Sequence, residues 1–361
     1  MRKEHGMKIV LTGGGTAGHV SGNMALVPHL KKQGFDIEYI GSVNGMEKDI
    51  VAKDPDIIYH GIPSGGLNRY FTWRNFRNVF RVARGISAAS RLIKQIKPDV
   101  VFSKGGFVTV PVVIAAHRNN IPVLIHESDI TPGLANKIAS KFADKICTTF
   151  PETVEYFPQG KAFCTGSPIR GEIYLGNKQT GLKLCGFEDE KPCIIVMGGS
   201  TGAAAVNKLV WDSLDALLPR FNVIHICGKD GCDPKYDGIK GYKQFGYVTD
   251  QLCHLLELSD VAISRAGSNA IFEFLAMAKP MVLIPLPKDV SRGDQVVNAQ
   301  SFQKQGFAVA CDQYTLTPEE LTRQVNDIYD RRAEIKASMN STGLLNGTDN
   351  IMEMILKAVG K

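Results

Sequence analysis

The sequence predicts an α/β protein made of two Rossmann-like domains, each built on a parallel sheet, that face one another across a cleft. Short apolar runs alternate with helix-length amphipathic segments nearly throughout the 361 residues, which is typical of parallel sheets with right-handed crossovers. Two of these runs end in glycine-rich turns, Gly13–Gly18 and Gly198–Gly202, about half a chain apart. Because such a turn presents backbone N–H groups at the start of a helix, each turn is a predicted anion seat.

The expected strands are continuous apolar runs, as in sheets that helices cover on both faces. In the first half they are residues 7–12, 37–41, 57–60, 99–103, 122–126 and 145–148. In the second half they are residues 193–197, 222–227, 242–246, 260–264, 281–285 and 307–310. The pattern restarts after Thr165–Pro168, which predicts one domain over 1–166 and a second over 167–344.

Composition excludes several classes of protein. Hydrophobic residues make up 44% of the chain and charged residues 22%, as in ordinary globular proteins. No apolar stretch approaches the roughly 20 residues that cross a bilayer, and the polar N-terminus leads directly into a strand, which argues against a signal peptide. The eight cysteines include no C-x-x-C pair, so we expect reduced thiols in a cytoplasmic protein.

The net charge of +6 comes from one segment. Between Leu67 and Lys97 the chain has eight basic residues and no acid, so the remaining residues sum to −2. Taken as a helix, the segment collects these arginines on one face: Arg74, Arg77, Arg81, Arg84 and Arg91. With Trp73 and Phe80 beside them, they suit an anionic lipid surface. The alternative is a solvated helix face. No nucleic-acid-binding module accompanies the segment, so no nucleic-acid partner is expected.

The first glycine turn carries a candidate general base. It matches the dinucleotide fingerprint, but the second strand ends in Gly41-Ser42, without the acid that an NAD site requires. His19 follows in the first turn of the helix, where the dipole disfavours a positive charge. A neutral imidazole beside an anion seat suits a base acting on a hydroxyl. The alternative is a residue that only caps or packs against the helix start.

Two further groups of polar residues follow strands of the first half. His126–Asp129 comes directly after one apolar run, and Lys104–Phe107 follows strand 99–103. Because ligands bind at the carboxyl ends of parallel strands, we expect His126–Asp129 to face the cleft and Lys104–Phe107 to line its acceptor side. Alternatively, His126–Asp129 caps the helix that begins near Gly133.

The second half repeats this arrangement. Ser264–Asn269 is a strand-to-helix turn, and Glu273 lies one turn into that helix, where a carboxylate can accept hydrogen bonds from a ribose diol. A purely structural acid that complements the helix dipole is the alternative. Gln295 follows a later strand and offers both a donor and an acceptor to sugar hydroxyls.

Several motifs together resemble one bacterial family over essentially the whole chain. They are Gly14–His19, Ser103–Phe107, His126-Glu127, Pro132–Lys137, Gly166–Arg170, Gly198–Ala203, Ser264–Gly267 with Glu273, and Asp294-Gln295 with Asn298-Ala299. In this order and combination they are similar to the MurG family of bacterial N-acetylglucosaminyltransferases.

The resemblance implies a GT-B fold in which the final helix, about residues 345–361, joins the N-terminal domain. It implies inverting transfer of GlcNAc from UDP-GlcNAc to the 4-hydroxyl of MurNAc in lipid I (undecaprenyl-diphospho-MurNAc-peptide), giving lipid II in peptidoglycan synthesis. No metal or cofactor is implied. The N-terminal domain would bind lipid I and the anionic inner leaflet, so the protein would be peripheral on the cytoplasmic side of the cell membrane.

The resemblance also assigns site residues. His19 and Glu127 are the implied catalytic residues, and the acceptor diphosphate lies against Gly14, Gly15 and Gly18. Contacts with UDP-GlcNAc are implied for Thr16, Ala17, Gly18, Arg170, Ser200, Val248, Ser268, Asn269, Ala270, Glu273 and Gln295.

Two positions depart from the usual pattern of the family. Ala17 stands where many members have glycine, and Ser128-Asp129 stands where many have Gln-Asn, so the donor contact of that asparagine is missing. Three other functions are open: a UDP-GlcNAc 2-epimerase of the same fold, an NAD-dependent dehydrogenase, and a non-catalytic membrane-binding protein.

Overall fold

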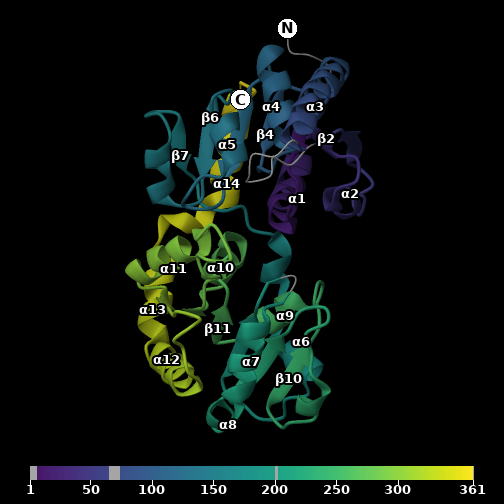
Figure 1. Ribbon diagram of the computed structural model, residues 1–361. Helices are drawn as coiled ribbons and strands as arrows, with labels where there is room; N and C mark the ends of the chain where they lie inside the picture. Colours follow the sequence, from purple (N-terminus) through teal and green to yellow (C-terminus); the bar gives the residue numbers. More distant parts are fainter. Residues whose placement is uncertain (1–5, 65–73, 200–201, 361) are drawn as a thin grey trace. The chain divides into compact units, whose positions relative to one another are not determined.

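The computed structural model describes residues 6–64, 74–199 and 202–360 (Figure 1). The chain divides into two compact units. The first unit comprises Met1–Arg170 with Asn346–Lys361, and the second comprises Gly171–Leu345. Each unit is built around one parallel sheet, and this confirms the predicted α/β class. All eight cysteines are free thiols.

The sheet of the first unit has seven parallel strands in the order β3-β2-β1-β4-β5-β6-β7. Their bounds are β1 (Met7–Thr12), β2 (Phe35–Ser42), β3 (Ile58–Ile62), β4 (Val100–Ser103), β5 (Val123–Glu127), β6 (Lys145–Thr148) and β7 (Ala162–Cys164). The six predicted strands are confirmed, with ends within two residues of those expected. Strand β7 was not predicted, because this edge strand has only three residues and exposes two of them, Phe163 and Cys164.

The helices of the first unit cover both faces of this sheet. They are α1 (Ala17–Lys32), α2 (Met46–Val51), α3 (Arg74–Ile96), α4 (Thr109–Arg118), α5 (Leu134–Ala139), the short 3-10 helix η1 (Pro151–Tyr156) and α14 (Gly347–Ala358). The last of these packs against β4 and α1, and its Ile351 and Ile355 are buried in the same apolar cluster as Leu11 and Phe102. The Nδ2 group of Asn350 also donates a hydrogen bond to Thr165 O at 3.0 Å.

The sheet of the second unit has six parallel strands in the order β10-β9-β8-β11-β12-β13. They are β8 (Cys193–Met197), β9 (Asn222–Ile226), β10 (Tyr242–Phe245), β11 (Val261–Ser264), β12 (Met281–Leu283) and β13 (Ala308–Ala310), which confirms the strands predicted there. Its α-helices are α6 (Lys178–Cys185), α7 (Ala204–Asp212), α8 (Leu214–Leu217), α9 (Leu252–Leu258), α10 (Ser268–Ala276), α11 (Asp294–Lys304), α12 (Pro318–Asp330) and α13 (Arg332–Asn340). Short 3-10 helices are η2 (Gly171–Leu175), η3 (Pro234–Tyr236) and η4 (Gly343–Asn346).

Strand order places the candidate residues at one point of each sheet. In the first unit the order reverses between β1 and β4, and the glycine turns after these two strands are therefore neighbours. In the second unit it reverses between β8 and β11, so the turns after them are neighbours too. Ligands of open parallel sheets bind at such reversal points.

The basic segment contains a helix, as predicted from Arg74 onward. Within the part whose side chains are described, Arg84 and Arg91 are exposed, whereas Ala89 and Ile93 are buried against the core. Other residues named in the sequence analysis of this segment lie outside the described residues or side chains: Arg69, Trp73, Arg74, Arg77, Phe80 and Arg81. Among the helices that the structure describes, none combines the length and the apolar character that crossing a bilayer requires.

Candidate active site

Two glycine turns of the first unit pack directly against each other. The N–H of Gly14 donates a hydrogen bond to Gly105 O at 3.2 Å. Gly106 has a φ of +92°, and a Cβ there would lie 2.1 Å from Gly14 O, so only glycine fits this approach. The N–H of Gly14 is therefore engaged within the chain, and the contact of Gly14 with the acceptor diphosphate stays a prediction that cannot use this N–H. Gly15, with a φ of +82°, is exposed and keeps its predicted role.

His19 is held in one orientation by the first of these turns. Thr16 is the N-cap of α1, and its hydroxyl accepts a hydrogen bond from His19 N at 3.4 Å. The Nδ1 atom of His19 lies 2.9 Å from Gly14 O. Because a carbonyl oxygen only accepts, Nδ1 carries the proton and Nε2 is the basic nitrogen. A Cβ on Gly105 would lie 3.5 Å from this Nε2, so the imidazole stands beside both turns.

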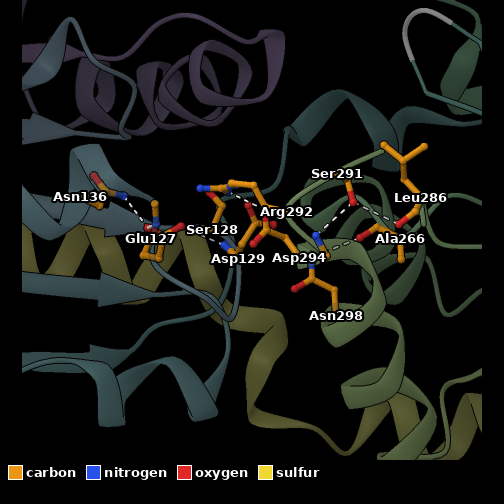
Figure 2. Close-up of polar contacts among 12 residues, drawn as sticks. Glu127, Ser128, Asp129, Asn136, Ala266, Leu286, Ser291, Arg292, Asp294 and Asn298 are labelled. Atoms are coloured by element: carbon orange, nitrogen blue, oxygen red, sulfur yellow. Dashed lines mark hydrogen bonds and ion pairs between the residues drawn. The ribbon is translucent and has the colours of Figure 1, made fainter. Parts of the chain in front are cut away.

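Glu127, at the end of β5, is 5% exposed and holds together the turn that follows it. Its Oε1 accepts hydrogen bonds from the N–H groups of Ser128 (2.9 Å) and Asp129 (3.1 Å). Its Oε2 accepts from Gly133 N (3.1 Å) and Asn136 Nδ2 (2.9 Å; Figure 2). Burial, and to a smaller extent the charge of Asp129, raise the pKa of this carboxyl. Both oxygens are thus engaged by the turn, and the catalytic role that the resemblance implies for Glu127 stays a prediction.

Asn136 was not identified as a site residue from the sequence, although it lies in the motif Pro132–Lys137. Its Nδ2 group donates to His126 O at 3.0 Å as well as to Glu127 Oε2. Both partners are acceptors, so the orientation of the amide is fixed, and its buried Oδ1 has no hydrogen-bond partner among the described residues. A Cβ on Gly105 would lie 3.3 Å from either amide atom, so Asn136 reaches the same point as His19.

Lys104 does not line the acceptor side, and that prediction is wrong. The side chain is completely buried, because it runs inward from the end of β4 instead of outward to solvent. Its amino group contacts His126 in β5 and Ser128 directly after this strand.

In the second unit, the turn after β8 is shaped by glycines. Gly199 and Gly202 have φ values of +98° and +77°. A Cβ on Gly202 would lie 2.3 Å from Cys227 O, so this glycine is required for packing against the end of β9. Ser200 lies outside the described residues.

The turn after β11 leads into α10, which carries four of the predicted donor contacts. Ser264 Oγ donates to Met197 O at 2.8 Å and joins the ends of β11 and β8. Ser268, the first residue of α10, is buried. The other three residues, Asn269, Ala270 and Glu273, are half-buried at the helix start.

Gln295 lies in the first turn of α11, after Gly293 (φ +82°). Its Oε1 accepts a hydrogen bond from Leu286 N at 2.9 Å, so the side-chain N–H₂ is the group that it presents to a ligand. One turn further, Asn298 Nδ2 donates to Ala266 O at 3.2 Å and ties α11 to the turn before α10 (Figure 2).

The remaining predicted contacts lie elsewhere in the two units. Val248 is half-buried in the segment after β10, and Arg170 is the half-buried last residue of the first part of the first unit. Within the residues that the structure describes, no three His, Cys, Asp or Glu side chains are grouped as metal ligands would be.

Comparison with known proteins identifies two domains of one family. Residues 9–148 match the glycosyltransferase family 28 N-terminal domain, and residues 193–355 match the glycosyltransferase family 28 C-terminal domain. A protein of Clostridium botulinum (strain Langeland) is 51% identical over 97% of this chain and 99% of its own length. One of Geobacillus kaustophilus is 49% identical over 96% of this chain and 98% of its own. Both are named UDP-N-acetylglucosamine–N-acetylmuramyl-(pentapeptide) pyrophosphoryl-undecaprenol N-acetylglucosamine transferase.

Solved structures agree with this. The crystal structure of Acinetobacter baumannii MurG is 26% identical, with a TM-score of 0.77 over 97% of this chain and 99% of that one. A UDP-GlcNAc 2-epimerase from Neisseria meningitidis has a TM-score of 0.69 over 97% of this chain and 100% of that one, but at 13% identity it shares the fold alone. With both domain matches and relatives that are about half identical over nearly their whole length, the chain belongs to glycosyltransferase family 28.

Proposed function

We propose that this protein transfers GlcNAc from UDP-GlcNAc to the 4-hydroxyl of MurNAc in lipid I and so produces lipid II. Relatives that bear the name of this transferase are 49–51% identical over 96–97% of the chain. The epimerase alternative is supported here by a structural neighbour that is only 13% identical. The conclusion is therefore a transferase with a nucleotide-sugar donor and a lipid-linked acceptor.

The geometry that carries the proposal is the orientation of His19. Its Nδ1–H donates to Gly14 O, so Nε2 is the basic nitrogen, the one able to take the proton of the acceptor hydroxyl. The deprotonating oxygen attacks the anomeric carbon of GlcNAc from the face opposite UDP, and the bond to the diphosphate breaks with its electron pair leaving on UDP. Because attack and departure occur on opposite faces, the configuration inverts. Help of this kind contributes about 10²–10⁴ in rate.

The donor is held chiefly by the second unit. Glu273 on α10 accepts hydrogen bonds from the ribose hydroxyls, and the backbone at Ser268 and near Val248 contacts the nucleotide. The diphosphate lies at the turn after β8, where Gly199 and Gly202 adopt left-handed conformations. Gln295 donates from its side-chain nitrogen to a sugar hydroxyl, because its oxygen is engaged by Leu286 N.

The acceptor is held by the first unit. Its diphosphate lies against Gly15 and Gly18 at the start of α1, where the helix dipole favours an anion. This helix carries no acidic residue in its first turn to oppose that charge. Thr16, Ala17 and Arg170 supply the remaining predicted contacts with the substrates.

Attachment to the inner leaflet of the cell membrane is proposed for α3. The exposed Arg84 and Arg91 belong to a segment with eight basic residues and no acid, and juxtamembrane basic residues each contribute about 1 kcal/mol at an anionic surface. The proposed location is accordingly the cytoplasmic side of the membrane, where the headgroup of lipid I would be accessible to a peripheral enzyme.

The test is incubation with radiolabelled UDP-GlcNAc and a lipid I analogue. Label in the lipid phase is expected. Label that stays in the nucleotide sugar and appears as ManNAc would support the epimerase instead.

A further inference from the structure

Lys104 is a fully buried lysine beneath the turn that carries Glu127 and Asp129. Its backbone N–H donates to Thr12 O at 2.9 Å, which fixes the start of the turn after β4 to the end of β1. The side chain then runs alongside α1, where a Cβ on Gly22 would lie 2.2 Å from Lys104 Cε. The absence of a side chain at Gly22 is therefore what admits the lysine.

The amino group of Lys104 joins one side chain near the end of β5 to one directly after it. Its Nζ lies 2.7 Å from His126 Nδ1 and 2.8 Å from Ser128 Oγ. His126 Nε2 lies 3.1 Å from Gly166 O, so Nε2 carries the ring proton and Nδ1 accepts from the lysine. Burial and the nearby charge of Lys104 hold the pKa of His126 well below its ordinary value, so the ring stays neutral. Lys104 is thus a donor to both partners.

Several titratable groups face this amino group. Glu127 and Asp129 lie on the turn after β5 and favour its charged form, whereas burial opposes it more strongly and lowers the pKa of Lys104 to about 7. From β6 comes the Cys147 thiol, whose pKa burial raises to about 12, so it is uncharged. From α1, the charge of His19 contributes to the lowered pKa of His126. Lys104 therefore gains or loses its proton near neutral pH. Its two hydrogen bonds do not depend on that proton, because a neutral amine can also donate them.

Resting on the proposed function, we propose that Lys104 is a positioning residue for the anionic acceptor. Its two hydrogen bonds fix the turn 126–129, and its positive charge offsets the carboxylates of Glu127 and Asp129 on the unit where the lipid diphosphate binds.

The turn that Lys104 fixes is connected to the proposed base. Glu127 binds Asn136 Nδ2, and Asn136 stands beside Gly105 together with His19 Nε2. A shift of the turn would move the acceptor relative to His19 without touching the donor contacts on α10. A change in the acceptor KM with an unchanged donor KM therefore distinguishes a shift of the turn from a general loss of stability.

The test compares initial rates of GlcNAc transfer to a lipid I analogue by the wild type, Lys104→Met, Ser128→Ala and Lys279→Met. Lys279 is the matched control: it is a buried lysine of the second unit whose Nζ donates to Ser259 O at 2.6 Å. Donor and acceptor are varied separately, and pH is varied from about 6 to about 9.

We expect Lys104→Met to raise the acceptor KM about 10- to 100-fold, with the donor KM within about threefold of wild type. Ser128→Ala should raise the acceptor KM in the same direction by a smaller factor. Wild-type kcat/KM for the acceptor should fall above about pH 7 as Lys104 loses its proton, and Lys104→Met should lack this fall. Lys279→Met should be less stable yet keep both the acceptor KM and the fall.

An unchanged acceptor KM in Lys104→Met, or the same fall with pH in that variant, would overturn the inference while leaving the proposed function intact. A wild type that transfers no GlcNAc overturns the proposed function and this inference together. If Lys104→Met does not fold, Ser128→Ala and the wild-type pH profile decide: an unchanged acceptor KM or a flat profile contradicts the role of Lys104.

Discussion

The Nδ1 atom of His19 lies 2.9 Å from the carbonyl oxygen of Gly14. This contact gives the glycine turn a role beyond anion binding, because the turn also selects the tautomer of the adjacent imidazole. The proton resides on Nδ1, so the basic nitrogen is Nε2, beside Gly105 and Asn136. The same carbonyl fixes the base and packs against Gly106, so the base and the second glycine turn are coupled by one peptide unit.

Replacing His19 tests its role as the base. His19→Ala should lower kcat by about 10²–10⁴, with a donor KM close to wild type, because the lost group acts on the acceptor hydroxyl. His19→Asn is the matched control, since its side-chain N–H₂ can still donate to Gly14 O but offers no base at the Nε2 position. Steady-state kinetics check both variants. Recovery of turnover in His19→Asn would mean that the contact with Gly14, and not the base, is what the reaction needs.

Replacing Glu273 tests the donor site. Hydrogen bonds to a charged group contribute about 1.5–3 kcal/mol, so Glu273→Ala should weaken UDP binding about 10- to 100-fold. Titration calorimetry with UDP measures this directly. Glu257→Ala, at an exposed glutamate on α9 of the same unit, should bind UDP normally. Normal UDP affinity in Glu273→Ala would refute the ribose contact.

Reversing charges on α3 tests membrane attachment. A variant with Arg77, Arg81 and Arg84 changed to Glu should lose sedimentation with anionic vesicles, and the wild-type binding should weaken as salt is added. The matched control reverses three exposed basic residues of the second unit: Lys208, Arg323 and Arg331. Equal vesicle binding by the two variants would exclude α3 as the attachment surface.

The buried charge of Lys104 predicts how stability depends on pH. The folded protein loses the Lys104 proton from about pH 7, whereas the unfolded chain keeps it until near the ordinary lysine value of 10.5. Between these values the unfolded state binds more protons, so the free energy of unfolding should rise with pH, by up to about 1.4 kcal/mol per pH unit relative to Lys104→Met. Denaturant unfolding of both proteins at several pH values measures the difference. A difference that is constant with pH would show that Lys104 titrates normally.

Gly22→Ala tests the passage that admits Lys104. The added methyl group would lie 2.2 Å from Lys104 Cε, so the lysine must move. The free energy of unfolding should therefore fall by about 1–3 kcal/mol. In a Lys104→Ala background, Gly22→Ala should change the free energy of unfolding little, because the lysine side-chain atoms that the methyl group would meet are absent. Gly343→Ala, with no atom within 4 Å of the new Cβ, is the control. Equal effects of Gly22→Ala in both backgrounds would contradict the packing described.

Most of the fold follows from local sequence signals. Runs such as Ile194–Val196 are apolar throughout because helices cover both faces, and the glycines after them end each strand in a turn. The edge strand β7 gave no such signal, since Phe163 and Cys164 face solvent.

The site could be predicted only where local sequence determines it, and not where it depends on contacts between distant residues. The place of His19 follows from the turn and helix around it, but its tautomer depends on the conformation of Gly14. The loss of the Gly14 donor depends on Gly105, which is far along the chain. The burial of Lys104 depends on Gly22 in α1. Without knowledge of this contact, a lysine directly after a strand is predicted to be exposed.

The most direct test of the account is the product formed from radiolabelled UDP-GlcNAc and a lipid I analogue, analysed for both the attachment and the anomeric configuration of the labelled sugar. The account predicts label in the lipid as GlcNAc β-linked to the 4-position of MurNAc, with its appearance slowed about 10²–10⁴-fold in His19→Asn. An α-linkage, or wild-type rates in that variant, would contradict it.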